Sequence, residues 1–159
     1  MSVSVSQILV VTHSRTGSTV RLRDALVAGT AEADGEVDVV SLAASDAGLD
    51  DVLAADAMVF ATPARFGALA GLTKDFLERI YPWFDEVPDV RPGMPWTAVV
   101  KGATDPSGAV RDLERILTGL RWRQVLPALQ CTGVVTPADL AAAAEIGAAL
   151  AAGLDIGLW

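Results

Sequence analysis

The chain has 159 residues, which suits one domain of ordinary size and leaves little room for a second core, so we expect a single domain over residues 1–159. Hydrophobic residues make up 52% of the chain and charged residues 20%, a composition typical of a folded globular protein. The net charge of −8 has the wrong sign for binding nucleic-acid phosphates or anionic membranes, and we predict neither partner. A single cysteine and a single histidine exclude an internal disulfide and a structural zinc cluster.

The first residues carry no visible signal for export. Met1 to Ser6 contains no basic residue, and the apolar run after it, Ile8 to Val11, is too short for a signal peptide or a membrane-spanning helix. We therefore expect a cytoplasmic protein.

The first half of the chain alternates between predicted strands and helices. The β-branched run Ile8 to Val11 predicts a buried strand, and an apolar stripe from Leu22 to Gly29 predicts the helix after it. Val37 to Leu42 alternates more in polarity, which is typical of an edge strand. Met58 to Ala61 predicts another buried strand, and Leu72 to Ile80 has helical spacing.

The second half continues the alternation after a proline-rich, linker-like stretch, Asp85 to Pro95. Trp96 to Val100 predicts a third buried strand. From Ala109 to Leu120, apolar residues follow the three-and-four spacing of one helix face, with charged residues on the other face. A fifth strand is predicted within Val125 to Thr132, interrupted or skewed by Pro127.

The last helix has a clear beginning. Thr136 can cap it, Pro137 suits the first helical position, and Asp139 places an acid in the first turn. We predict that the alanine-rich run extends this helix to Leu154.

Five strand–helix units predict an α/β fold in three layers, with a five-stranded parallel sheet in the order 2-1-3-4-5 and helices on both faces. In such sheets a ligand binds beyond the carboxyl ends of the strands, where the strand order reverses. The segments after the first, third and fourth strands are therefore the candidates for a site.

The segment after the first strand is rich in small hydroxyl residues: Ser14, Arg15, Thr16, Gly17, Ser18 and Thr19. Backbone N–H groups at the start of a helix, with hydroxyls beside them, predict a site for a phosphate monoester. The segment lacks the lysine of a Walker loop and the G-x-G-x-x-G pattern, which disfavours nucleoside triphosphates and a standard dinucleotide site. The alternative is a helix cap with surplus hydroxyls.

This string resembles the [S/T]-x-T-G-x-T loop of flavodoxins, which binds the FMN phosphate, and it lies between the first strand and helix as in that family. The resemblance implies a flavodoxin-like fold with non-covalent FMN as its cofactor.

The segment after the third strand contains Thr62, Pro63, Ala64, Arg65, Phe66 and Gly67. Pro63 stiffens a turn, Gly67 permits close approach of the backbone, and Phe66 offers an aromatic face, so exposed amides here can bond flavin N5 and O4. The alternative is a proline turn with a buried phenylalanine. With Ala70-Gly71 and Phe76-Leu77, the segment resembles the "TPxRFG…AG…FL" segment of the NAD(P)H:quinone oxidoreductases first called tryptophan-repressor-binding proteins.

The segment after the fourth strand begins with Gly102, Ala103, Thr104 and Asp105. It is similar to the flavodoxin loop that supports the pyrimidine edge of the flavin, although many ordinary turns share its composition.

Together the resemblances imply an FMN-dependent oxidoreductase that passes electrons from NAD(P)H to a quinone or similar acceptor, with no side chain predicted to be catalytic. The chain lacks the insertion after the fourth strand and the paired histidines of those quinone oxidoreductases. We therefore do not expect their tetramer, and we consider a homodimer instead. Two alternatives remain: an electron carrier that docks to redox partner proteins, and a flavin-free binding module. The partner is accordingly a small molecule or a redox protein.

Several single residues have two interpretations. His13 is expected to be a hydrogen-bonded structural residue, with a charge sensor near the phosphate as the alternative. Arg65 either steers NAD(P)H phosphates or a quinone, or forms a surface ion pair. Cys131 is expected to be a buried strand residue without an activated thiolate.

We expect the four tryptophans to pack in the core or at an interface, with Trp83 and Trp96 as alternative stacking partners of a flavin. The apolar tail that ends at Trp159 is expected to dock on the body or on another subunit.

Overall fold

A parallel sheet forms the centre of the molecule. The computed structural model describes residues 4–81 and 91–159. The main strands pair in the order β2-β1-β3-β5-β6, and β7 pairs with β5 beyond β6. Their bounds are β1 Ser6–Thr12, β2 Val37–Ala43, β3 Ala57–Arg65, β5 Pro95–Gly102, β6 Arg123–Gln124 and β7 Leu129–Thr132. Because β6 and β7 together occupy the place of one strand, the predicted α/β class and the order 2-1-3-4-5 are confirmed.

The fifth strand is broken into two pieces. Trp96 pairs with Gln124 and Val99 pairs with Leu129, so the two residues between them on β5 lie opposite residues 125–128. Pro127 lies in this break and cannot donate a ladder hydrogen bond, while the Thr97 hydroxyl donates to the Leu126 carbonyl at 3.2 Å. The predicted interruption is confirmed, but the strand begins earlier than expected, at Arg123.

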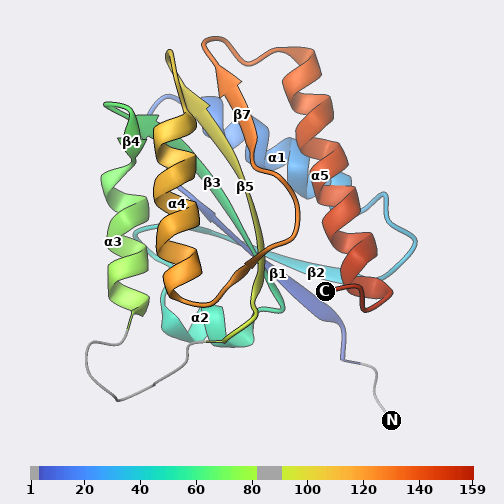
Figure 1. Cartoon of the computed structure of the whole chain (residues 1–159). Helices are drawn as coiled ribbons and strands as arrows, with labels where there is room; N and C mark the ends of the chain where they lie inside the picture. The colour runs from blue at the N-terminus through green and yellow to red at the C-terminus, as the bar shows by residue number, and fades with distance from the viewer. Residues whose placement is uncertain (1–3, 82–90) are drawn as a thin grey trace.

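Helices cover both faces of the sheet, and Figure 1 shows α2, α3 and α4 on one face with α1 and α5 on the other. Their bounds are α1 Ser18–Thr30, α2 Leu49–Ala54, α3 Gly71–Ile80, α4 Ser107–Gly119 and α5 Pro137–Asp155. Four of them confirm the helices predicted from periodicity. The fifth, α2, has no counterpart among those predictions, because its six residues are too few to show a helical stripe.

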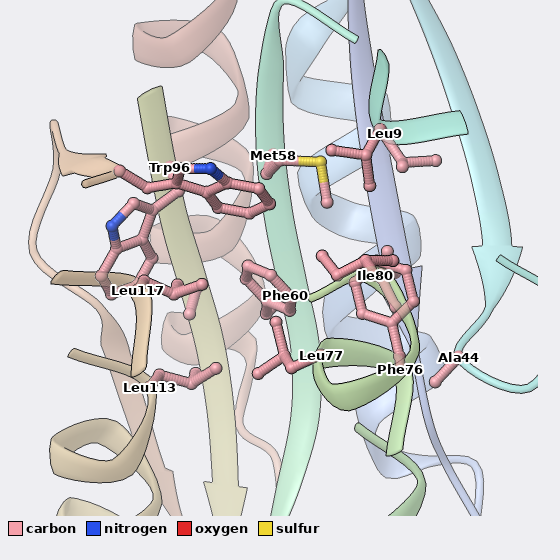
Figure 2. Close-up of a cluster of buried hydrophobic side chains, with 14 of the residues drawn as sticks. Leu9, Ala44, Met58, Phe60, Phe76, Leu77, Ile80, Trp96, Leu113 and Leu117 are labelled. Carbon is pink, nitrogen blue, oxygen red and sulfur yellow. The ribbon is translucent and has the colours of Figure 1, made fainter. Parts of the chain in front are cut away.

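The core divides into two clusters because successive strand residues point to opposite faces. In the cluster under α3 and α4, Phe60 lies between Phe76 and Trp96, with ring centroids 6.2 and 6.4 Å away (Figure 2). Trp96 and Trp122 are both buried, which confirms core packing for these two residues and makes Trp96 unavailable for stacking on a flavin. Trp83 lies outside the described residues.

Helices α1 and α5 cross at two glycines on the other face. A Cβ atom on Gly29 would lie 2.0 Å from the Ala144 carbonyl oxygen, and one on Gly147 would lie 2.0 Å from the Leu26 carbonyl oxygen. The two backbones therefore approach to a distance that no larger side chain allows.

Helix α5 is also long and apolar enough to cross a membrane, with 19 residues and a mean hydropathy of 1.3. Alanine supplies much of that hydropathy, and the buried face of the helix belongs to the core cluster. After this helix, the Trp159 ring lies against Gly153. The end of the chain therefore packs on its own domain, which is one of the two arrangements expected from the sequence.

Candidate functional site

The predicted site segments meet at the carboxyl edge of the sheet. The central strands β1, β3 and β5 end at Thr12, Arg65 and Gly102. Figure 1 shows the short strand β4, Ala68–Leu69, beside the start of α4 at this edge. The crossover connections thus bring together three segments that are separated by tens of residues in the sequence.

The first segment leads into an uncapped helix. Gly17 precedes α1 with a φ of 86°, and its amide donates to the Ser14 hydroxyl at 3.1 Å. No side chain caps α1, and no acidic residue lies in its first turn. Of the six predicted residues, Thr19 alone is buried.

Helix α5 of the same chain, by contrast, has a capped N-terminus. The Asp139 amide donates to the Thr136 hydroxyl at 3.2 Å, and the Thr136 amide donates to the Asp139 carboxylate at 2.8 Å. These hydrogen bonds with Thr136 hold the pKa of Asp139 below its usual value. Because α1 has no such acceptor, its first amides are available to an anion.

The second segment is a hairpin, whereas its sequence predicts a loop. Strand β3 continues to Arg65, and Arg65 pairs with Ala68 of the antiparallel β4. Phe66 and Gly67 connect the strands with φ values of 51° and 73°, the signature of a two-residue type I′ turn. Within the described part of the chain, the amides of these two residues donate no hydrogen bond.

Two predicted residues of this segment lie beneath the surface. Thr62 and Pro63 are buried within β3, and the Thr62 hydroxyl lies 2.7 Å from the Thr73 hydroxyl of α3. They lie in a strand and not in a loop, and their contact with a cofactor stays a prediction. Phe66, by contrast, is fully exposed, so the alternative of a buried phenylalanine is wrong.

The hairpin is anchored on α4. The Leu69 amide donates to the Asp112 carboxylate at 2.9 Å, and Arg115 contacts the other oxygen of that carboxylate at 3.0 Å. A Cβ atom on Gly108 would lie 1.8 Å from the Gly67 carbonyl oxygen, so only glycine fits there. These contacts give the exposed Phe66 a fixed support.

The third segment forms a turn that begins α4. Gly102 is buried, whereas Ala103, Thr104 and Asp105 are exposed. The Asp105 carboxylate accepts a hydrogen bond from the Ser107 amide at 2.9 Å. Hydrogen bonds from the Ser107 side chain and backbone lower the pKa of Asp105. The turn is therefore explained locally, and its contact with a cofactor stays a prediction.

A cavity of about 590 Å³ lies between the first two segments. One side of its lining is cationic and is formed by His13, Arg15 and Arg65. The other side is apolar and is formed by Phe66, Leu69 and Leu72. The residues from Gly102 to Asp105 are not part of this lining. Sequence reasoning missed Leu69 and Leu72 at the site, because β4 is too short to show a period and Leu72 has the pattern of an ordinary helix residue.

The electrostatics of this cavity are positive. Burial, then Arg65, then Arg15 lower the pKa of His13 below its usual 6.5. No carboxylate among the described residues lies within ion-pair distance of Arg15 or Arg65. Within the same residues His13 makes no side-chain hydrogen bond, so the expected structural role is not seen.

Cys131 carries no chemistry at this site. It is buried in β7, and burial together with the nearby Asp139 carboxylate raises its pKa to about 12. The prediction of a buried residue without an activated thiolate is confirmed. No group of three or more metal-ligating side chains occurs within residues 4–81 and 91–159.

The donor set at the start of α1 fits the phosphate of FMN. It combines open amides, the hydroxyls of Ser14, Thr16 and Ser18, and a left-handed Gly17, where an added Cβ atom would have no neighbour within 4 Å. The result is an uncrowded cradle without a carboxylate, as a phosphate requires. The free amides of Phe66 and Gly67 could then contact a flavin edge.

Comparison with known proteins supports the architecture. No protein-family model and no curated protein matches the sequence. Among solved structures, a flavodoxin from Streptococcus pneumoniae TIGR4 superposes with a TM-score of 0.77 at 20% identity, over 92% of this chain and 99% of that one. A WrbA-like flavodoxin from Agrobacterium tumefaciens gives 0.72 at 22% identity, over 92% and 95%. An azoreductase from Bacillus anthracis gives 0.73 at 12% identity, over 93% and 99%.

These similarities extend over almost the whole of each chain, and they agree with the strand order and the two helical layers described above. The chain therefore has the flavodoxin-like fold.

Proposed function

We propose that the protein binds FMN non-covalently and transfers electrons from NAD(P)H to a quinone or a similar acceptor. The observation that carries the proposal is the uncapped start of α1, where Gly17 and three hydroxyl residues surround free amides. The similarity of the two motifs to flavodoxins and quinone oxidoreductases supports it, as does the fold.

The residues of this chain supply binding and orientation. The amides at the start of α1 bind the phosphate, and their fixed positions set the distance from the phosphate to the sheet edge. The Phe66 and Gly67 amides hold the edge of the ring, and the anchored hairpin keeps them in place. FMN, when bound, supplies the redox chemistry, so that NAD(P)H, one proton and a quinone give NAD(P)⁺ and the hydroquinone.

The electron-carrier alternative draws support from the net charge of −8, which suits docking to a basic protein. The charges that line the cavity are, however, cationic. This local charge favours small anionic molecules such as NAD(P)H at the site, and it is the reason why we place the oxidoreductase first.

A single substitution at Ser18 should change FMN affinity and protein stability in opposite directions. Ser18 is the first residue of α1, so Ser18→Asp places a carboxylate beside the helix dipole and should stabilise the flavin-free protein by about 0.5 kcal/mol. The same carboxylate repels the phosphate, and we expect the Kd for FMN to rise by roughly 100-fold. Quenching of flavin fluorescence measures the Kd, and urea denaturation measures the stability.

Two controls make the test specific. Ser18→Asn has nearly the same shape without the charge, so it should bind FMN much more tightly than Ser18→Asp. Riboflavin lacks the phosphate, so its affinity should not change in Ser18→Asp. Equal FMN affinities of the two variants would contradict a phosphate site at α1.

Turnover distinguishes the enzyme from the carrier. With FMN bound, steady oxidation of NADH or NADPH in the presence of a quinone is expected. A protein that holds FMN but shows no turnover is a carrier, and a protein that takes up no FMN is neither.

A further inference from the structure

The cavity between loop 13–17 and the β3–β4 hairpin borders the predicted flavin position, since Arg15, Arg65 and Phe66 belong to both, but it extends away from that position. The resemblance places the ring between residues 62–67 and 102–105, yet residues 102–105 do not line the cavity. Its walls instead reach toward α3 through Leu69, Gly71 and Leu72. At about 590 Å³ it has the size of a small-molecule site.

One side of the cavity gathers positive charge without a counterion. Arg15 and Arg65 both lie close enough to His13 to disfavour its protonation, and neither has a carboxylate partner in the described parts of the chain. Arg15 is exposed and Arg65 is partly buried. Like charges that converge in this way repel each other, and a bound anion would relieve that repulsion.

The other side is apolar and rigidly held. Phe66 stands fully exposed at the rim, and Leu72 at the start of α3 is 42% exposed. An exposed phenylalanine with positive φ is unfavourable both in solvation and in backbone conformation. The hydrogen bond from the Leu69 amide to Asp112 fixes the hairpin that carries it. An aromatic ligand would cover this surface.

From the two sides together we infer that the cavity binds an aromatic anion, a planar ring that carries a carboxylate or a sulfonate, with Arg15 and Arg65 on the charge and Phe66 and Leu72 on the ring. This ligand is the acceptor of the electron transfer, and that role alone rests on the proposed function. Acidic aromatic acceptors are therefore preferred over neutral ones of the same shape.

Redox-inert probes test the site without any turnover. Naphthalene-2-sulfonate combines ring and charge, 2-naphthalenemethanol keeps the ring alone, and methanesulfonate keeps the charge alone. Calorimetric titration of the FMN-loaded and the flavin-free full chain is expected to show naphthalene-2-sulfonate binding at least tenfold more tightly than either of the other two.

Matched charge variants locate the binding. Arg65→Gln should remove most of the preference for naphthalene-2-sulfonate, and Arg65→Lys should keep most of it. Arg123 is exposed in β6 and pairs with the first residue of β5, at the far end of the sheet. Arg123→Gln therefore removes the same charge without touching the cavity and should bind the probe as the wild type does. If Arg65→Gln is unstable, Arg15→Gln, in an exposed loop, replaces it in the same binding measurement.

The single histidine gives an independent spectroscopic readout. His13 is the only histidine of the sequence, so its ring C2 proton gives one NMR signal in tag-free protein. A bound sulfonate should raise the pKa of His13 by partly neutralising Arg15 and Arg65, whereas 2-naphthalenemethanol should leave it unchanged.

The outcomes separate the two proposals. Equal affinity for the sulfonate and the alcohol, an equal effect of Arg65→Gln and Arg123→Gln, or displacement of naphthalene-2-sulfonate by saturating FMN would overturn the inference. Selective binding of naphthalene-2-sulfonate by a protein that takes up no FMN would support the anion site and reject only the proposed cofactor.

Discussion

At the scale of single residues, Phe66 has an unfavourable environment for a large apolar side chain. Its side chain is fully exposed and its φ is 51°, in a type I′ turn that favours asparagine followed by glycine. Stability alone would not place a phenylalanine there. Its position at the rim of a cationic cavity accounts for it as a contact surface for a ring.

Replacing Phe66 should therefore have opposite effects on stability and binding. Phe66→Asn creates an Asn-Gly turn and should raise the free energy of unfolding by about 1 kcal/mol, measured by urea denaturation. It should also weaken the binding of naphthalene-2-sulfonate, because the ring contact is lost.

The control is Phe66→Ala, which removes the ring but keeps a side chain that is strained at positive φ. It should weaken binding to a similar extent without the gain in stability. A loss of stability in Phe66→Asn would mean that the phenylalanine ring makes a stabilising contact.

At the scale of elements, α1 and α5, which lie on the same face of the sheet, differ in whether their first turn is capped. α5 closes its first turn with Thr136 and Asp139, whereas α1 leaves its first turn open. Both helices nevertheless depend on the same glycine crossing for their packing. The crossing holds α1 against the body, and with it the uncapped first turn at its start.

The glycine crossing predicts a reversal of the usual helix propensity. Alanine is normally favoured over glycine inside a helix by about 1 kcal/mol. Gly147→Ala should instead lower the free energy of unfolding by about 1–3 kcal/mol, because its Cβ would meet the Leu26 carbonyl oxygen and force the helices apart.

Gly119, the last residue of α4, is the matched control, since a Cβ atom there would have no neighbour within 4 Å. Gly119→Ala should be neutral or stabilising by up to about 1 kcal/mol in the same urea denaturation experiment. A stabilising effect of both substitutions would show that the two helices are free to move apart.

At the scale of the whole molecule, the charge is unevenly placed. The chain carries a net charge of −8, but the cavity at the carboxyl edge of the sheet is lined by two arginines and a histidine. The excess of acid disfavours nonspecific anion binding over most of the surface, while the local cations attract anions to one place. The lining of this cavity thus has the opposite sign to the net charge of the chain.

Binding of FMN should stabilise the whole domain, because the ligand binds only the folded state. At about 100 times the Kd, the gain is about 2.7 kcal/mol, which corresponds to a rise in Tm of roughly 5 to 10 °C for a domain of this size. Thermal denaturation monitored by circular dichroism measures it. An unchanged Tm with saturating FMN would rule out the flavin.

The sequence by itself determined the order of the main strands and four of the five helices, but neither α2 nor β4. Periodicity marked the buried strands, the edge strand and four helices, since the burial of one helix face or of both strand faces leaves a pattern within a few neighbouring residues. The hydroxyl-rich segment before α1 and the Thr136 cap were equally visible, because such motifs depend on residues close together in the chain.

The tertiary structure alone decided what meets at the carboxyl edge. The pairing of Arg65 with Ala68 turns an expected loop into a hairpin, and the hydrogen bond from Leu69 to Asp112 joins residues 43 positions apart. The meeting of His13, Arg15 and Arg65 leaves no trace in local sequence, because it depends on how the crossovers place β1 beside β3. Local forces choose the elements, and long-range packing builds the site.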